Sequence, residues 1–459
     1  MLKPLKITWV NHAGYVISYD NINVLVDPWI SGTSFNNGWN LLTKSFFPNN
    51  LIEKIDYLWI SHEHPDHFST STLKILNKKR VKVIFQKTKD KRVANYLNKL
   101  GFKVIELDNY KKFSISQNFK VTIIKNDQID SLSIFELGDK KIINTNDCVL
   151  DQNKLDLIKK KTLIKTFDIL LTQFSYASWI GNVENNILRK KASLEKIKQI
   201  ENQIKCFEPK VTIPFASYIY FCHEENKYMN DEITNIDEVK KCIEKNQSLP
   251  IFLYPGSTFE IDKDIKNYKK DFLKYKKDFS DINSNQFIKT IKINFTELEY
   301  NSKNYIKKIK KKNGYLLILI CTLLSNLSNY IFNRDLFGFS ATKIYLFDID
   351  KYVEFNLLKG LKLLDNSRAS DCDVDISSDS LNYIFLYDWG IGSLMINGRG
   401  KYTSEYKKWK FNRVFSLGQI NSIGKTLFKK ILEKFIKKIL LKKSIHLENY
   451  ESSFLRKLK

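Results

Sequence analysis

The first part of the chain alternates short apolar runs with polar turns. Residues 6–19 and 23–27 are rich in Ile, Val and Tyr, so they predict two β-strands joined by a polar turn. Similar short runs predict further strands at 57–60, 81–85, 104–107, 113–115, 120–124, 132–137 and 141–144. Helices that alternate with runs of paired strands are typical of an α+β fold or a four-layer sandwich.

The pattern continues to residue 223. Residues 168–173 predict an apolar strand, and 192–207 predict a helix with Leu194, Ile200 and Ile204 on one side. Residues 211–221 predict a strand that places His223 at its end.

A shift in composition divides the chain. Residues 1–262 form the expected first domain, and residues 263–312, rich in Lys, Asn and Asp, are interpreted as a connecting region. Residues 313–459 are expected to form a smaller C-terminal α/β domain, which includes a strand at 393–397. The chain ends in a basic amphipathic helix from Ile423, with Phe435 and Ile439 on its apolar face. We expect that face to pack on the second domain, and docking on anionic lipid is the alternative.

Composition limits the partners. The net charge of +25 comes mostly from scattered Lys in a chain also rich in Ile and Asn, without a basic motif interleaved with aromatic residues. We therefore expect no nucleic-acid partner, although a basic surface steers small anionic substrates. Six cysteines without a CxxC pair, and no apolar leader, predict free thiols and a cytoplasmic location. The most apolar run, 315–324, is about half the length of a bilayer span, so no transmembrane segment is expected.

A dense histidine cluster stands out at residues 61–68, Ser-His-Glu-His-Pro-Asp-His-Phe. Pro65 excludes a helix interior, so this is not the His-Glu-x-x-His helix of zinc peptidases. In an extended loop alternate residues point the same way, so His62 and His64 can bind one ion while Asp66 and His67 turn towards a second. The cluster therefore predicts a metal site.

Together with two distant residues, this cluster resembles the ligand set of the metallo-β-lactamase superfamily. The resemblance implies an αββα four-layer sandwich over residues 1–262 and one or two divalent ions, Zn, Fe or Mn. Such ions lower the pKa of a bound water and neutralise charge that forms on an attacked oxygen. The implied ligands, of which Asp66 and Asp147 are also the implied catalytic residues, are His62, His64, Asp66, His67, the bridging Asp147 and His223.

Two further residues are implied to support these ligands. Asp27 is expected to hydrogen bond the histidine loop. His12 matches a superfamily position beside the metals, and a purely structural histidine is the alternative. The segments 373–381 and 390–398 resemble a sterol-carrier-type domain that some superfamily members append, which implies an apolar pocket or a homodimer contact.

A closer resemblance is to CMP-N-acetylneuraminate monooxygenases, whose bacterial relatives are described as UDP-MurNAc hydroxylases. It rests on residues 24–29 (Val-Leu-Val-Asp-Pro-Trp), 144–148, and 214–223 (Pro-Phe-Ala-Ser-Tyr-Ile-Tyr-Phe-Cys-His). It implies an anionic sugar or sugar nucleotide as substrate. The oxygenases of this branch carry a Rieske domain, but this sequence has no Cys-x-His pair, so N-acetyl hydroxylation would need a separate electron-donor protein. Hydrolysis by metal-activated water is the simpler alternative.

One ligand of the superfamily is missing. No histidine lies between His67 and His223, and by position Asp127 or Asp130 takes its place. Two histidines with carboxylates suit Fe or Mn better than an all-histidine zinc site does. The sequence thus predicts a metal-dependent hydrolase or hydroxylase. A single-metal site, and a non-catalytic ligand-binding or scaffold descendant with an incomplete site, are the alternatives.

Overall fold

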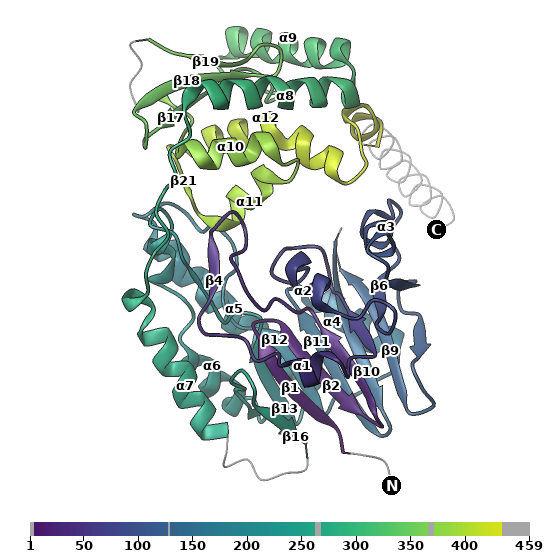
Figure 1. The fold of residues 1–459 in the computed structure, drawn as a ribbon. Coiled ribbons are helices and arrows are strands. Elements are labelled where there is room, and N and C mark those ends of the chain that lie inside the picture. Colours follow the sequence, from purple (N-terminus) through teal and green to yellow (C-terminus); the bar gives the residue numbers. More distant parts are fainter. Residues whose placement is uncertain (1–3, 127–128, 262–267, 366–370, 434–459) are drawn as a thin grey trace, which may run out of the picture. The chain divides into compact units, whose positions relative to one another are not determined.

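The computed structural model describes residues 4–126, 129–261, 268–365 and 371–433 (Figure 1). The chain forms two compact units. The first runs to Lys289 and includes Ile396–Gly398, and the second comprises Thr290–Met395 and the residues from Arg399 onward.

This division differs from the predicted one at the connecting region. Residues 263–312 hold two helices, α7 (Tyr268–Ser280) in the first unit and most of α8 (Phe295–Asn313) in the second. Their many lysines mask an amphipathic pattern, since α8 buries Leu298, Tyr305 and Ile309 along one side.

The first unit is built on two seven-stranded sheets. One has the order β16-β1-β2-β3-β5-β6-β7, with antiparallel pairing from β16 to β3 and parallel pairing from β3 to β7. Its strands are β1 (Lys6–Asn11), β2 (Gly14–Tyr19), β3 (Ile22–Val26), β5 (Tyr57–Trp59), β6 (Lys82–Gln86), β7 (Lys103–Leu107) and β16 (Thr258–Glu260).

The second sheet has the order β15-β13-β12-β11-β10-β9-β8, and its pairing changes from parallel to antiparallel at β11. Its strands are β8 (Lys112–Ser114), β9 (Phe119–Asn126), β10 (Asp130–Leu137), β11 (Lys140–Asn146), β12 (Ile169–Gln173), β13 (Val211–Phe215) and β15 (Leu249–Pro250). A separate ribbon pairs β4 (Trp39–Leu41) with β14 (Ile219–Phe221).

Helices cover the sheets to give the predicted αββα sandwich. The first sheet packs against α2 (Thr70–Ile75) and α3 (Arg92–Lys99), which bury Leu73, Val93 and Leu97 against it. The second contacts α5 (Asn186–Phe207) and α6 (Ile236–Lys245), with α4 (Gln152–Thr162) beside α5, and α1 (Asn49–Ile52) precedes β5. The main core contains side chains of both sheets, because strands that are apolar on both faces need cover on both sides. The α+β class and this architecture are confirmed.

The second unit contains a five-stranded sheet of order β19-β18-β17-β20-β21. Its strands are β17 (Thr342–Leu346), β18 (Lys351–Asn356), β19 (Gly360–Leu363), β20 (Val374–Ile376) and β21 (Gly400–Tyr402). Helix α8 contacts β19 and the helices α9 (Tyr315–Phe332), α10 (Ser378–Leu386) and α12 (Glu405–Ser422).

Three local expectations differ from the structure. The predicted strand 393–397 is part of helix α11 (Gly390–Asn397), since its five residues are too few to distinguish the helical from the strand period. The apolar run 315–324 extends to Phe332 as α9. Leu194 is exposed, because α5 turns Arg189 and Ser193 inward on that part of the helix. Most of the basic helix predicted from Ile423 lies beyond residue 433 and therefore outside the described residues. Phe435 and Ile439 belong to that part.

Candidate metal centre

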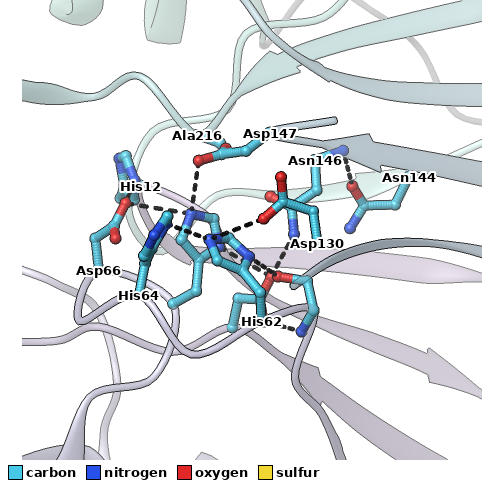
Figure 2. A network of polar contacts seen from close by, with 12 residues as sticks. His12, His62, His64, Asp66, Asp130, Asn144, Asn146, Asp147 and Ala216 are labelled. Carbon is cyan, nitrogen blue, oxygen red and sulfur yellow. Dashed lines mark hydrogen bonds and ion pairs between the residues drawn. The ribbon is translucent and has the colours of Figure 1, made fainter. Parts of the chain in front are cut away.

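Strand ends of both sheets bring the predicted site residues together. His12 follows β1, Asp27 follows β3, and the histidine loop follows β5. In the second sheet Asp130 begins β10 and Asp147 follows β11. Figure 2 shows the carboxylates of Asp130 and Asp147 pointing towards the histidine rings. Residues separated by more than 100 positions therefore share one buried cluster.

One ligand group combines two histidines with the carboxylate that takes the missing histidine's position. His62 Nε2 lies 2.9 Å from His64 Nδ1 and 4.0 Å from Asp130 Oδ1. These three residues form a group whose ligand atoms lie within 4.8 Å of one another. Asp130 is thus the described residue in the position of the third histidine, and Asp127 lies outside the described residues.

Two further ligand groups meet at His67. Its Nε2 lies 3.2 Å from Asp66 Oδ2 and 3.3 Å from Asp147 Oδ2. Asp66 Oδ2 is also 3.2 Å from His12 Nε2, which makes His12, Asp66 and His67 one group. His62, His67 and Asp147 form the other and connect the two halves of the centre. His12 therefore lies among the candidate ligands.

Asp27 fixes the orientation of the histidine loop. Its Oδ1 accepts a 2.8 Å hydrogen bond from the Ser61 backbone N–H, and its Oδ2 lies 3.1 Å from His67 Nδ1. The Asn146 side chain donates to the same Oδ2 at 2.6 Å. With Nδ1 of His67 held by Asp27, and Nδ1 of His62 2.8 Å from Ser61 Oγ, both rings turn Nε2 towards the centre. Such a partner sets the tautomer that a metal ligand needs.

Charge in the cluster is divided between neutral and ionised groups. Burial, reinforced by His67 and His64, lowers the pKa of His62 well below its usual value, so this ring is a neutral donor. At His67 burial acts in the same direction, but the Asp66 and Asp147 carboxylates override it and raise the pKa well above the usual value. Burial opposes ionisation of Asp147, yet His67 lowers its pKa to about 2. The buried carboxylate of Asp66 and the half-buried carboxylate of Asp147 thus depend on positive charge between them.

The hydrogen bonding of these residues fits a bound cation. Asp66 Oδ1 and His67 Nε2 are buried atoms for which the described part of the structure offers no hydrogen bond of acceptable geometry. His67 Nε2 nevertheless lies close to two carboxylates. Buried polar atoms left in this state are costly unless another partner satisfies them. A divalent ion with nitrogen and oxygen ligands would satisfy both. His62, His64 and Asp130 would hold one ion, and His12, Asp66, His67 and Asp147 another.

His223 is buried after β14 but belongs to none of the ligand groups found among the described residues. Its ring Nδ1 accepts a 3.2 Å hydrogen bond from the Glu225 backbone N–H. The His223 backbone N–H donates to Asn226 Oδ1 at 2.9 Å. These contacts fix a turn after the ribbon strand. Its role as a ligand stays a prediction.

A chain of polar side chains behind Asp147 escaped the sequence analysis. Gln173, at the end of β12, donates from Nε2 to Asp147 Oδ1 at 3.0 Å, and Lys196 of α5 donates from Nζ to Gln173 Oε1. Burial lowers the pKa of Lys196, and the Asp147 charge opposes that effect. A strand-end Gln near a predicted strand-end ligand was a usable signal. One lysine in a Lys-rich helix was not.

Several residues of the centre have left-handed backbone conformations. The φ angles are 44° at His12, 36° at Asp27, 50° at Asn146 and 53° at Ala216. Asp and Asn tolerate this region, whereas His and Ala adopt it at a cost of roughly 1–3 kcal/mol. The surrounding sheets hold the strand ends in these conformations and so direct the side chains inward.

Comparisons with known proteins agree with this geometry. Residues 6–156 match the model of the beta-lactamase superfamily domain. The cytidine monophosphate-N-acetylneuraminic acid hydroxylase of Gorilla gorilla gorilla is 26% identical over 280 residues, which cover 57% of this chain and 46% of that protein. The enzyme of the same name from Danio rerio is 25% identical over 300 residues, with coverage of 57% and 47%. The chain therefore spans about half the length of the curated relatives it matches.

Among solved structures, the diiron β-hydroxylase CmlA from Streptomyces venezuelae aligns with a TM-score of 0.41 and 17% identity. The alignment covers 56% of this chain and 54% of CmlA. Residues 6–156 of the first unit are thus similar to the beta-lactamase superfamily domain, and 57% of the chain is similar to the CMP-N-acetylneuraminic acid hydroxylases.

Proposed function

We propose that this protein is a metal-dependent enzyme that hydroxylates the N-acyl group of an anionic sugar or sugar nucleotide. The observation that carries the proposal is the mixed ligand set, in which Asp130 replaces a histidine beside His62 and His64. Carboxylates and imidazoles together suit iron or manganese better than an all-histidine zinc site does. The curated relatives to which the chain is similar are named hydroxylases, which supports the same reaction class.

The reaction needs more than the metal centre. Hydroxylation inserts one oxygen atom of O₂ into a C–H bond and reduces the other to water with two electrons and two protons. The residues of the ligand groups would hold the metal, and a redox-active pair bound there would supply the reduction of O₂. The electrons would come from a separate electron-donor protein, and a Rieske-type protein fits this role.

A lysine close to the centre supports an anionic substrate. Lys196 places a cation behind Asp147 through Gln173. On the other side the Phe35 ring lies 5.8 Å from the His64 ring and 4.6 Å from the Trp39 ring, and both aromatic side chains are buried.

The metal content of purified protein tests the first step. At least one equivalent of Fe or Mn per chain is expected, and less than about half an equivalent of any divalent metal would remove the basis of the proposal. Asp130→Ala is expected to lose part of this metal with the fold retained. Asp373→Ala, at a buried aspartate of the second unit, is the matched control and should keep the full content.

Labelled dioxygen separates the reactions. With an added reductant and an N-acetylated sugar nucleotide, one ¹⁸O atom from ¹⁸O₂ is expected in the product. Release of acetate or sugar phosphate that carries oxygen from H₂¹⁸O would show a hydrolase instead. Ligand binding without turnover, unaffected by Asp147→Ala, would identify a binding or scaffold protein.

A further inference from the structure

Helix α9 of the second unit buries mainly polar side chains and exposes apolar ones. It contains no charged residue and, within the described residues, is the one helix long and apolar enough by length and composition to cross a membrane. The side chains it buries are Ile318, Thr322, Ser325 and Ser328. The large apolar side chains that it exposes are Tyr315, Leu316, Ile320, Leu323, Leu324, Leu327, Tyr330, Ile331 and Phe332. A surface helix of a protein surrounded only by water shows the opposite arrangement.

The apolar side chains are exposed along the whole of α9, so fraying at a helix end does not explain their exposure. Leu316 is 67% exposed, Leu323 is 56% exposed and Leu327 is 53% exposed, across more than three turns of the helix. A continuous apolar surface of this kind marks an interaction site. We call the surface formed by the nine exposed apolar residues the α9 face.

Hydrogen bonds attach the opposite side of the helix to its own unit. Ser325 Oγ accepts from the Phe339 N–H at 2.9 Å, and Ser328 Oγ accepts from the Leu336 N–H at 3.1 Å. A helix that crossed a bilayer would have to break these contacts. The attached helix, which runs beside α8 in Figure 1, can instead lie along a surface with the α9 face towards it.

Basic and aromatic residues stand at both ends of α9. Lys310, Lys311 and Lys312 form the last turn of α8 directly before it, where Lys310 donates to the Leu358 carbonyl and Lys312 pairs with Asp388. After it, Arg334 lies over the Tyr406 ring at 5.2 Å, and Tyr406 stacks on Trp409, which is 41% exposed. Cations bind anionic headgroups, and Tyr and Trp prefer the boundary between headgroups and hydrocarbon. The nearby Asp335 is buried, and its carboxylate accepts backbone N–H groups of the following loop.

We propose that α9 docks the protein on an anionic phospholipid bilayer, with the α9 face in the interface and the flanking cations among the headgroups. The charge at both helix ends favours this partner over a second copy of the chain, whose own lysines would meet these lysines across a symmetric contact. The proposal does not depend on the metal centre. It assigns a different role to the second unit.

Vesicle flotation with the full chain tests the proposal. We expect the protein to float with phosphatidylcholine vesicles that contain phosphatidylglycerol and to bind vesicles of phosphatidylcholine alone at least about ten times more weakly. Leu323→Glu with Leu327→Glu should reduce binding to the anionic vesicles by about a hundredfold. Ile187→Glu, at a 79% exposed position of α5 in the first unit, is the matched control and should bind like wild type.

Three results would overturn the proposal. The first is no binding to anionic vesicles. The second is binding that survives the double glutamate change, which would assign it to the basic C-terminal residues beyond 433. The third is a stable dimer in light scattering that the same double change converts to monomer, which would assign the α9 face to a second copy. His62→Ala should leave flotation unchanged.

Discussion

The metal centre and helix α9 break the usual rule of burial in opposite ways. The centre buries charge, with Asp66 and His67 almost wholly inaccessible, whereas α9 exposes leucines and buries hydroxyls. Buried charge persists because each group faces an opposite charge or a hydrogen-bond donor within the unit. The α9 face has no such internal compensation among the described residues. Charged groups that pair with one another form a site inside one unit. An exposed apolar surface instead marks a site for a partner outside the unit.

The largest expected effect comes from removal of the central cation. In metal-free protein, His67→Ala leaves the buried Asp66 carboxylate and the half-buried Asp147 carboxylate without their positive neighbour. We expect the free energy of unfolding to fall by about 3–5 kcal/mol, measured by urea denaturation. A loss below about 1 kcal/mol would show that these carboxylates are solvated rather than paired.

Replacement of the Asp27 carboxylate, which holds His67 from behind, should lower the affinity for the metal. Asp27→Asn keeps the side-chain size and tolerates the φ of 36° but weakens the hold on His67 Nδ1. Metal affinity is expected to fall by roughly 10–100-fold in competition with a chelator, as for other groups that orient a metal ligand. Asp56→Asn, whose carboxylate pairs with Arg80 at the surface, should not change it. An unchanged affinity in Asp27→Asn would mean that the sheets alone orient the ring.

The inverted polarity of α9 can be tested by exchanging its faces. Ser325→Leu inserts a large side chain on the buried side and removes the Phe339 N–H acceptor, so a loss of about 1–3 kcal/mol in stability is expected. Leu323→Ser on the α9 face should change stability by no more than about 0.5 kcal/mol. Equal losses from the two changes would mean that the exposed side is covered within the unit, and the contrast would disappear.

The smallest effect is the pH dependence of the metal-free protein. The pKa of His67 is raised, so its stabilising contribution is complete below about pH 6.5 and is lost as the pH rises through the raised value. The pKa of Asp147 is about 2, so its contribution is complete above about pH 4 and is lost as the pH falls towards 2. We expect a stability maximum between these limits, with an alkaline slope of at most about 1.4 kcal/mol per pH unit that His67→Gln removes. An unchanged slope in His67→Gln would contradict the assigned pairing.

Local sequence predicted the parts of the fold that depend on period and turn chemistry. The strands before His62 and Asp147 were predicted within a few residues, because short runs of aromatic or β-branched residues favour strands. The connecting region and residues 393–397 were misread, since lysines and short mixed segments leave the helical period ambiguous.

By itself, the sequence determined the candidate metal-binding loop, because three histidines and an aspartate within six residues must lie within reach of one another. Only the tertiary structure decided that Asp130 joins His62 and His64, that His12 faces Asp66, and that Lys196 reaches Asp147 through Gln173. It also decided which side of α9 faces outward. Each of these depends on where distant strand and helix ends meet, and that position is set by the packing of whole sheets and helices rather than by any local pattern.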